Sequence, residues 1–376
     1  MNVGVLTSSR ADFGIYLPLL KVLKKDPYFS VSIIAFGTHL SPFHGNTIDN
    51  IAEEGFVVDH KIETVPVGDS AKAISSSMAL TMSKFADFWE GCKSDFDLVF
   101  CLGDRYEMFA AVYAAVPYGI KFAHFHGGET TLGAIDNKFR HSISIASDIH
   151  FVSTENYGQK VAELTGTWDD IYVVGALSLD NIHGINLLSI EEIKRKFKID
   201  LSTPTILFTF HPETINADRN SKYAMIITET VSVLSERYQI IVTLPNADTE
   251  NLQYRNAYLA LEKELEGSVK CVESFGTQGY FSMMRYCSML LGNTSSGIIE
   301  AATFGKRVID IGDRQKGRVK ASNVLNVPVD KKEILDAVHE IEGHGPFEGD
   351  NPYYQGGAVM KVVKILKAHS SFRKHD

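Results

Sequence analysis

The chain has 376 residues, of which 44% are hydrophobic and 22% charged, a composition typical of water-soluble globular proteins. Its formal net charge of −9, without any block of Lys and Arg, excludes a nucleic acid as the expected partner. No run of about 18 apolar residues could span a membrane and the N-terminal residues do not form a secretory signal, so we expect a cytoplasmic protein with no membrane partner.

The length predicts two domains, because a single hydrophobic core rarely grows to this size. The four cysteines, Cys92, Cys101, Cys271 and Cys287, show neither paired spacing nor the regular framework of a disulfide-rich protein. We expect them to be buried free thiols.

In the first half of the chain, short apolar runs alternate with longer amphipathic segments. The pattern predicts strands at Val3–Thr7, Val31–Phe36, Leu98–Leu102 and Phe122–Phe125, and helices at Tyr16–Leu23, Ala71–Phe88 and Tyr106–Ala115. Such β-α-β alternation is typical of a parallel sheet that is covered by helices on both faces.

The second half repeats this scheme. Strands are predicted near Thr205–Phe210, Gln239–Val242, Val269–Val272, Met289–Leu291 and Val308–Ile311, and helices near Ala224–Leu234, Leu252–Leu265, Tyr280–Tyr286 and Ser296–Phe304. We therefore predict an α/β protein of two doubly wound, Rossmann-like domains.

The boundary between the domains is expected after the strand at residues 171–175, in the polar, glycine-containing stretch at 178–186. This gives an N-terminal domain of residues 1–180 and a C-terminal domain of residues 181–376. The last helical pattern, Ala358–Leu366, could pack back on the first domain, which the sequence alone does not settle. Ligands of doubly wound folds bind beyond the carboxyl ends of the strands, so the residues that follow each strand are the candidate site.

Charged residues follow three strands of the first domain. Arg10 comes after the first strand, where its planar group could bind a phosphate, although a solvated loop arginine has the same pattern. His39 follows the second strand and could contact a ligand or be an ordinary loop residue. Asp104 and Arg105 follow a wholly apolar strand, and Asp104 could act in chemistry or simply cap the next helix.

The fourth strand of the first domain ends in two histidines, His124 and His126, followed by Glu129. Alternation along a strand places the two histidines on one face, which allows a metal site, but no further pair of ligands has a fixed spacing. A proton-transfer role for His126 and Asp136 fits the sequence better. We therefore predict no bound metal.

In the second domain, His211 follows the first strand and Pro212 ends that strand. The stretch from Ser288 to Ala301 reads as a strand, a tight turn at Gly292 and the start of a helix. The free backbone N–H groups at such a turn favour an anion, although small polar residues there are also ordinary helix caps. Arg314 lies in a glycine-containing loop with two more positive charges, and the loops at 245–249 and 274–276 could line a base pocket.

Taken together, these motifs resemble a known family, the hydrolysing UDP-N-acetylglucosamine 2-epimerases of bacterial sialic-acid biosynthesis. The resemblance covers most of the chain, in the order of the family. It is carried by seven segments: Ser9-Arg10-Ala11-Asp12-Phe13-Gly14, Gly103-Asp104-Arg105, Gly127-Gly128-Glu129, Asp136 with Arg140-His141-Ser142, His211-Pro212, residues 292–297 and Gly312-Asp313-Arg314-Gln315.

This resemblance implies a fold like that of the GT-B glycosyltransferases, with a UDP-sugar as substrate in the interdomain cleft. It implies that the proton at sugar C2 is removed as UDP leaves, that a 2-acetamidoglucal forms, and that water then adds at C1 while C2 is reprotonated. The products would be UDP and N-acetylmannosamine. The resemblance further implies that no metal or nicotinamide cofactor takes part, and that the protein is a homodimer or homotetramer.

Residue by residue, the resemblance implies catalytic roles for Asp104, Asp136 and His211, and the position of His126 after its strand adds this histidine to the candidate catalytic set. The resemblance implies contacts with UDP or the sugar for Arg10, Arg105, Glu129, Ser295, Ser296, Gly297, Glu300 and Arg314. His39 joins these candidate contacts because it follows the second strand. Glu300 would accept hydrogen bonds from the ribose hydroxyls, and the serines would serve the diphosphate. Which carboxylate is the base and which the acid stays open.

One departure from the family concerns His126, because many relatives have a glutamate just before Gly-Gly-Glu. Histidine can move a proton near neutral pH, but the change leaves the proton route and the substrate open. The related enzymes that act on UDP-N,N′-diacetylbacillosamine share the same motifs, so this sugar is an alternative substrate. A GT-B glycosyltransferase and a UDP-sugar sensor without activity are more distant alternatives.

Overall fold

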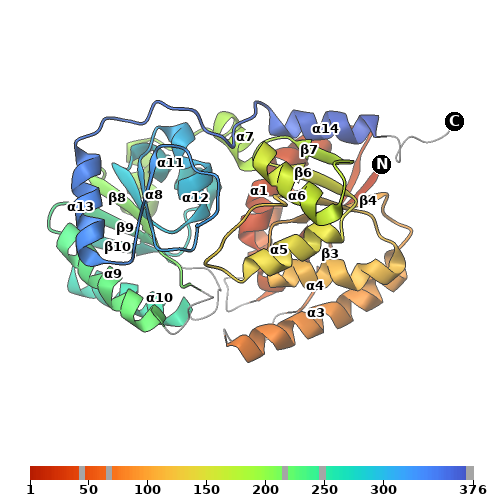
Figure 1. Ribbon diagram of the computed structural model, residues 1–376, viewed down its shortest axis with the longest axis horizontal. Coiled ribbons are helices and arrows are strands. Elements are labelled where there is room, and N and C mark those ends of the chain that lie inside the picture. Colours follow the sequence, from red (N-terminus) through yellow and green to blue (C-terminus); the bar gives the residue numbers. More distant parts are fainter. Residues whose placement is uncertain (42–46, 65–69, 214–218, 245–250, 370–376) are drawn as a thin grey trace. The chain divides into compact units, whose positions relative to one another are not determined.

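The computed structural model describes residues 1–41, 47–64, 70–213, 219–244 and 251–369, which form two compact units (Figure 1). Unit 1 contains Met1–Glu129, Asp136–Gly184 and Tyr353–Asp376, and unit 2 contains Thr130–Ile135 and Ile185–Pro352. Each unit is built around its own parallel sheet.

Unit 1 has a seven-stranded sheet with the order β3-β2-β1-β4-β5-β6-β7. All neighbouring strands in it are parallel. The strands are β1 (Asn2–Thr7), β2 (Ser30–Phe36), β3 (Val58–Ile62), β4 (Leu98–Leu102), β5 (Phe122–Phe125), β6 (Ile149–Val152) and β7 (Ile171–Val173).

Helices cover both faces of this sheet, which is why β4 and β5 are buried at every residue. They are α1 (Arg10–Leu23), α2 (Ile48–Glu53), α3 (Ala71–Cys92), α4 (Tyr106–Ala115), α5 (Asp136–Ile145), α6 (Glu155–Thr165), α7 (Leu177–Gly184) and α14 (Ala358–Ala368). On one face α14 packs with α1 and α7, and on the other Phe85 and Trp89 of α3 pack with α4.

Unit 2 has a six-stranded parallel sheet with the order β10-β9-β8-β11-β12-β13. Its strands are β8 (Thr205–Thr209), β9 (Gln239–Thr243), β10 (Val269–Val272), β11 (Met289–Gly292), β12 (Val308–Ile311) and β13 (Val324–Val327). Its helices are α8 (Ile190–Phe197), α9 (Asn220–Leu234), α10 (Asn251–Glu264), α11 (Gly276–Tyr286), α12 (Ser295–Ile299) and α13 (Lys331–Glu342).

The predicted strands agree with the structure to within a residue or two, and the predicted α/β class is confirmed. Two helices differ. Helix α1 begins at Arg10 rather than at Tyr16, because the Ser9 side chain accepts a hydrogen bond from the Asp12 N–H and so caps an earlier start. The helix predicted at residues 296–304 is two short pieces, α12 and a 3-10 helix at Ala301–Phe304, with Glu300 at their junction.

The short segment Thr130–Ile135 belongs to unit 2, although the residues on either side of it belong to unit 1. The Leu132 N–H donates to the carbonyl of Lys316 at 2.9 Å. Gly133 lies so close to the backbone of residues 313 and 314 that an added Cβ would be 2.6 Å from the Asp313 carbonyl oxygen. The segment is therefore held tightly against the loop that follows β12.

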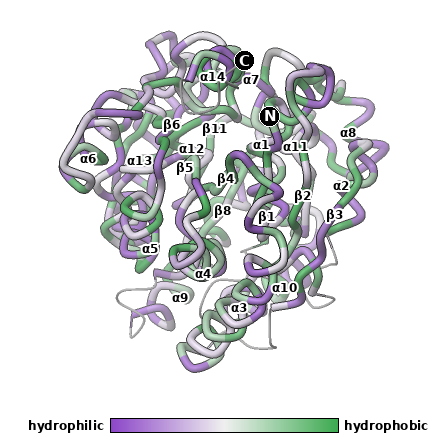
Figure 2. The backbone as a smooth tube through the Cα atoms, turned by 90° about the vertical axis from the view of Figure 1, so that its right-hand side faces the viewer, coloured by the Kyte–Doolittle hydropathy of each residue, from purple (hydrophilic) through white to green (hydrophobic). Residues whose placement is uncertain are grey.

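Hydrophilic and hydrophobic residues interleave along the outer helices, as Figure 2 shows for α3. Among the residues that the structure describes, no helix is both long enough and apolar enough to cross a membrane. The four cysteines are free thiols as predicted, and Cys271 is half-buried whereas the other three are buried.

Candidate active site

The strand order reverses at the same place in both sheets. In unit 1 the chain leaves β1 towards β2 and β3 and then returns to β4 on the other side of β1, and in unit 2 β8 and β11 are related in the same way. The crevice beyond the carboxyl ends of such a strand pair is the usual ligand site of doubly wound folds. Four predicted residues, Arg10, Asp104, His211 and Ser295, closely follow these four strands.

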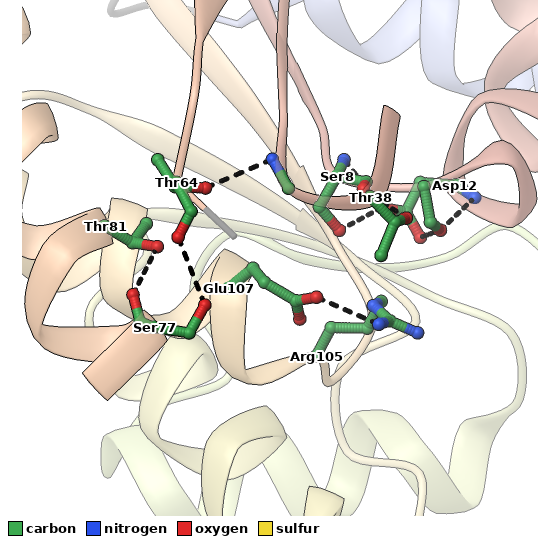
Figure 3. A network of polar contacts seen from close by, with 10 residues as sticks. Ser8, Asp12, Thr38, Thr64, Ser77, Thr81, Arg105 and Glu107 are labelled. Carbon is green, nitrogen blue, oxygen red and sulfur yellow. Dashed lines mark hydrogen bonds and ion pairs between the residues drawn. The ribbon is translucent and has the colours of Figure 1, made fainter. Parts of the chain in front are cut away.

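A network of buried hydrogen bonds holds the turn that follows β1 in unit 1 (Figure 3). The Asp12 carboxylate accepts hydrogen bonds from the Ser8 N–H at 2.9 Å, the Ser8 hydroxyl at 2.7 Å and the Ser9 hydroxyl at 2.9 Å. The Thr38 hydroxyl donates to the Ser8 carbonyl at 2.9 Å. These bonds fix the turn from which Arg10, the first residue of α1, extends.

His39 lies in a 3-10 helix at Gly37–Leu40 and is fully buried. Its Nε2 is 2.9 Å from the Thr7 hydroxyl and its Nδ1 is 2.9 Å from the Thr47 hydroxyl. Burial lowers the pKa of this ring. Both ring nitrogens are thus engaged by threonines, and any contact of His39 with a substrate stays a prediction.

Asp104 forms an ion pair with Arg140, whose side chain is 2% exposed. Arg140 also donates to the backbone carbonyl of Glu129 at 2.7 Å and contacts the Asn137 side chain at 3.3 Å. The alternative in which Asp104 caps α4 is wrong, because the N-cap of that helix is Arg105 and no side chain caps it. Arg140 therefore joins the turn after β4 to the turn after β5.

His126 and Glu129 form a second buried pair. Nδ1 of His126 lies 2.7 Å from Oε1 of Glu129, and the Ser153 hydroxyl donates to the same carboxylate oxygen at 3.1 Å. His126 has a φ of +61°, a backbone conformation that costs energy for a residue with a side chain. The surrounding fold holds this conformation and points the ring at the carboxylate.

His124, the other histidine of this strand, has a different environment. Its Nε2 donates to the Gly103 carbonyl at 2.9 Å and its Nδ1 accepts from the Ser144 hydroxyl at 3.0 Å, while burial lowers the pKa of the ring to about 3. The ring is neutral and holds the turn that carries Asp104. No group of three His, Cys, Asp or Glu is placed to hold a metal ion in the part of the chain that the structure describes.

Two further predicted residues of unit 1 lie near these pairs in the sequence. Arg105 forms an ion pair with the fully buried Glu107, with Nη2 2.9 Å from Oε1 (Figure 3). Asp136 is the first residue of α5, where the negative charge of a carboxylate interacts favourably with the helix dipole. The same helix carries Arg140 one turn later.

In unit 2, His211 follows β8 and is 7% exposed. Its backbone is hydrogen-bonded to the side chain of Asn293, which begins the turn after β11. Arg314 donates from Nη1 to the Pro212 carbonyl at 2.6 Å, so this predicted phosphate ligand also supports the loop that carries His211.

Ser295, Ser296 and Gly297 form the first residues of α12, which has only five residues. The cap of this helix is Thr294, whose hydroxyl accepts from the Ser296 N–H. At Gly297 an added Cβ would be 2.9 Å from a methyl of Val308, so close packing on β12 requires glycine here whatever it binds.

Glu300, the proposed ribose ligand, is 6% exposed. It lies near the buried hydroxyl of Tyr280, whose pKa is raised by burial and, to a smaller extent, by the Glu300 charge. The loop at 245–249, predicted to line a base pocket, lies outside the described residues.

Sequence reasoning did not assign a role to the three residues that organise the two sites, Arg140, Ser153 and Asn293. A signal existed for Arg140, because its spacing of four from Asp136 places both on one face of α5. No local pattern connects Ser153 or Asn293 to their partners, which are 24 and 82 residues away.

Comparison with known sequences decides the family. The sequence pattern of a family described as UDP-N-acetylglucosamine 2-epimerase matches residues 21–367 of the chain. The chain belongs to this family. As a UDP-N-acetylglucosamine 2-epimerase family member it is an enzyme, and the predicted resemblance is confirmed.

Three similar proteins illustrate the range of this family. The chain is 32% identical to the polysialic acid biosynthesis protein P7 of Escherichia coli, an alignment that covers 99% of this chain and 95% of that protein. It is 33% identical to the hydrolysing GDP/UDP-N,N′-diacetylbacillosamine 2-epimerase of Campylobacter jejuni, with 86% and 84% covered. The structure of UDP-GlcNAc 2-epimerase from Neisseria meningitidis bound to UDP-GlcNAc has a TM-score of 0.81 at 18% identity and covers 98% and 100%, which confirms the GT-B-like fold.

Proposed function

We propose that the protein is a hydrolysing UDP-N-acetylglucosamine 2-epimerase, which converts UDP-N-acetylglucosamine and water to N-acetylmannosamine and UDP. The observation that carries the proposal is the bridge that Arg140 makes between the Asp104 carboxylate and the Glu129 backbone, in a chain that belongs to this family. Asp104 follows β4, and the pair of His126 and Glu129 follows the adjacent strand β5. Two carboxylates and an imidazole thus lie at strand ends, the usual ligand site of doubly wound folds.

The reaction needs two proton transfers at sugar C2. In the first step a base takes the C2 proton, the C–H electron pair forms the C1–C2 double bond, and the bond from C1 to the UDP oxygen breaks. In the second step water adds its oxygen to C1 and gives one proton to a base, while an acid returns a proton to C2 on the opposite face. C2–H is a weak acid, so both steps need groups that are positioned in advance.

The pair of His126 and Glu129 is suited to such transfers. Imidazole exchanges protons near neutral pH, and its contact with the carboxylate through Nδ1 fixes the orientation of the ring. Asp104 is the second candidate, because Arg140 holds its carboxylate while a quarter of the side chain stays exposed. Asp136 and His211 complete the set that we assign to the chemistry.

Nucleotide binding is assigned to unit 2. Ser295, Ser296 and Glu300 follow β11, and Arg314 follows β12. Backbone N–H groups at the start of α12 and the Arg314 guanidinium would stabilise the charge of the departing UDP. Arg10, His39 and Arg105 are assigned to substrate contacts in unit 1.

UDP-N,N′-diacetylbacillosamine is a second candidate substrate. It is favoured by the similarity to the Campylobacter jejuni enzyme, whose name states this sugar, with 33% identity. The two sugars share the atoms at C1 and C2, so the same residues serve either reaction.

Incubation of the purified protein with each UDP-sugar in deuterated water tests the proposal. We expect UDP release without an added acceptor, and deuterium at C2 of the freed, epimerised sugar. Sugar that is released without deuterium at C2 would refute the elimination route. If neither sugar releases UDP, the assignment as a hydrolysing epimerase fails.

A matched pair of variants tests the role of Asp104. Asp104→Asn should reduce turnover below detection while UDP affinity, measured by calorimetry, changes by less than about threefold, because the carboxylate acts in the transition state. Asp87→Asn on the exposed face of α3 is the control and should keep wild-type turnover. Loss of UDP binding in Asp104→Asn would instead assign this residue to structure.

A further inference from the structure

Asn293 uses all of its polar groups within unit 2, and it is fully buried. Its backbone N–H donates to the Thr209 carbonyl at 2.9 Å, and its backbone carbonyl accepts from Nε2 of Gln315 at 2.8 Å. Its side-chain oxygen accepts from the His211 N–H at 2.7 Å, and its side-chain nitrogen donates to the His211 carbonyl at 2.9 Å.

This pattern extends the pairing of β8 with β11 beyond the last residue of β11. The backbone of Asn293 pairs with Thr209, and its side-chain amide pairs with His211 two residues further along the same strand direction. An amide group carries a donor and an acceptor in one plane, as a peptide group does, so it replaces the missing backbone partner.

Gly292 makes this approach possible. Its φ is +136°, and an added Cβ would lie 1.9 Å from the Thr209 carbonyl oxygen. With any side chain at this position, the turn would move away from β8 and Asn293 would lose His211.

The loop after β12 supports the same segment from its other side. Arg314 donates to the Pro212 carbonyl at 2.6 Å, and the Asp313 N–H donates to the Glu213 carboxylate at 3.0 Å. His211 is thus followed by two residues that are themselves held in place.

We infer that Asn293 is the positioning residue for His211, fixing the backbone from which the imidazole extends. Asp at this position would keep the acceptor for the His211 N–H but place a second oxygen against the His211 carbonyl. Leu would have a similar size and neither bond. The link from this positioning to turnover rests on the proposed function, in which His211 takes part in the chemistry.

The experiment compares Asn293→Asp and Asn293→Leu with the same changes at Asn323. Asn323 is 2% exposed in the same unit, and its side-chain nitrogen donates to the Lys306 carbonyl at 2.8 Å, away from His211. Three quantities are measured on the full chain: resistance to urea, the NMR signals of the His211 ring nitrogens, assigned with His211→Gln, and kcat and KM for UDP-sugar hydrolysis.

We expect all four variants to lose stability, but only the Asn293 variants to shift the His211 ring signals. In Asn293→Asp, kcat should fall about 10- to 100-fold with KM changed by less than about threefold, because displaced catalytic groups slow the reaction without removing binding contacts. The Asn323 variants should keep kcat within about twofold. Gln315→Met, which removes only the bond to the Asn293 carbonyl, is the milder variant and should shift the same signals by less.

Unchanged His211 signals in folded Asn293→Asp, or in Gln315→Met where the former does not fold, would overturn the inference. Equal changes in the Asn293 and Asn323 variants would also overturn it, because the effect would then be general destabilisation. If the wild-type protein releases no UDP from either sugar, the proposed function fails, whereas the ring signals still decide the role of Asn293.

Discussion

Two buried histidines make the stability of unit 1 depend on pH. Burial lowers the pKa of His124 to about 3 and that of His150 to about 4. In the unfolded chain both rings titrate near pH 6.5, so below that pH the unfolded state binds more protons than the folded state. The stabilisation is complete above pH 6.5 and is lost as the pH falls towards the folded pKa values.

The size of this loss follows from the difference in proton binding. Between pH 6.5 and 5 each ring takes up about one proton on unfolding, which lowers the free energy of unfolding by about 1.4 kcal/mol per pH unit. At pH 5 the loss is about 2 kcal/mol for each histidine and about 4 kcal/mol for the pair. A loss of this size is a large part of the 5 to 15 kcal/mol by which domains are stable.

Urea denaturation followed by tryptophan fluorescence measures this effect. The chain contains two tryptophans, Trp89 and Trp168, and both belong to unit 1, so their fluorescence follows the unfolding of this unit. The wild-type protein is compared with His124→Asn and with a control, Thr165→Val, which changes a residue of the same unit that does not titrate. We expect the loss between pH 7.5 and 5 to be about 2 kcal/mol smaller in His124→Asn, and unchanged in the control.

The slope of the free energy of unfolding against pH is compared between variants, so that any destabilisation that a substitution causes equally at every pH cancels. Carboxylates that titrate in the same range contribute equally to the variants and cancel in the difference. If His124→Asn shows the same pH slope as the wild-type protein, the ring of His124 does not stay neutral on folding, and the reasoning from its burial is refuted.

Three further predictions concern the two sites. Gly292→Ala should destabilise unit 2 by about 3 kcal/mol or more, because a Cβ would overlap the Thr209 carbonyl. The control Gly276→Ala, where φ is positive but the space is open, should cost about 1 kcal/mol. Similar losses for the two variants in urea denaturation, followed by circular dichroism, would contradict the overlap at Gly292. Arg140→Lys should lower kcat about 10- to 100-fold, because one ammonium group cannot bridge Asp104 and the Glu129 carbonyl as the guanidinium does. A variant with the wild-type kcat would show that the mechanism does not need this bridge. His126→Glu should change the ratio of turnover between the two UDP-sugars if this position distinguishes them, and a constant ratio would restrict it to proton transfer.

Much of the fold could be predicted because its signals are local. The strand at Leu98–Leu102 and the helix at Tyr106–Ala115 were predicted to the residue. The strand is a short continuous apolar run, the helix has apolar residues at three- and four-residue spacing, and a polar turn separates them. Strands β3, β6 and β13 were missed. β3 and β13 lie at sheet edges and carry polar residues that weaken the pattern, and β6 has only four residues, one of them a histidine.

The candidate site was harder to predict, because its pairs join distant parts of the chain. The position of Asp104 at a strand end was visible in the sequence, but its partner Arg140 is 36 residues away on helix α5. His124 at the end of β5 and His126 just after it look alike in the sequence. The structure separates them by their partners, Gly103 and Ser144 for His124 and Glu129 for His126, and by the positive φ of His126.

The return of α14 to unit 1 has a consequence for the order in which the protein folds during synthesis. Val362 and Leu366 of this helix are part of the hydrophobic core beside α1, yet the ribosome makes them after the whole of unit 2. The part of the α1 surface that α14 covers therefore stays exposed until the residues from Ile185 to Gly357 have been made, and exposed apolar surface of this kind is prone to aggregation. We expect nascent chains to complete the later unit first and to recruit chaperones to the earlier one.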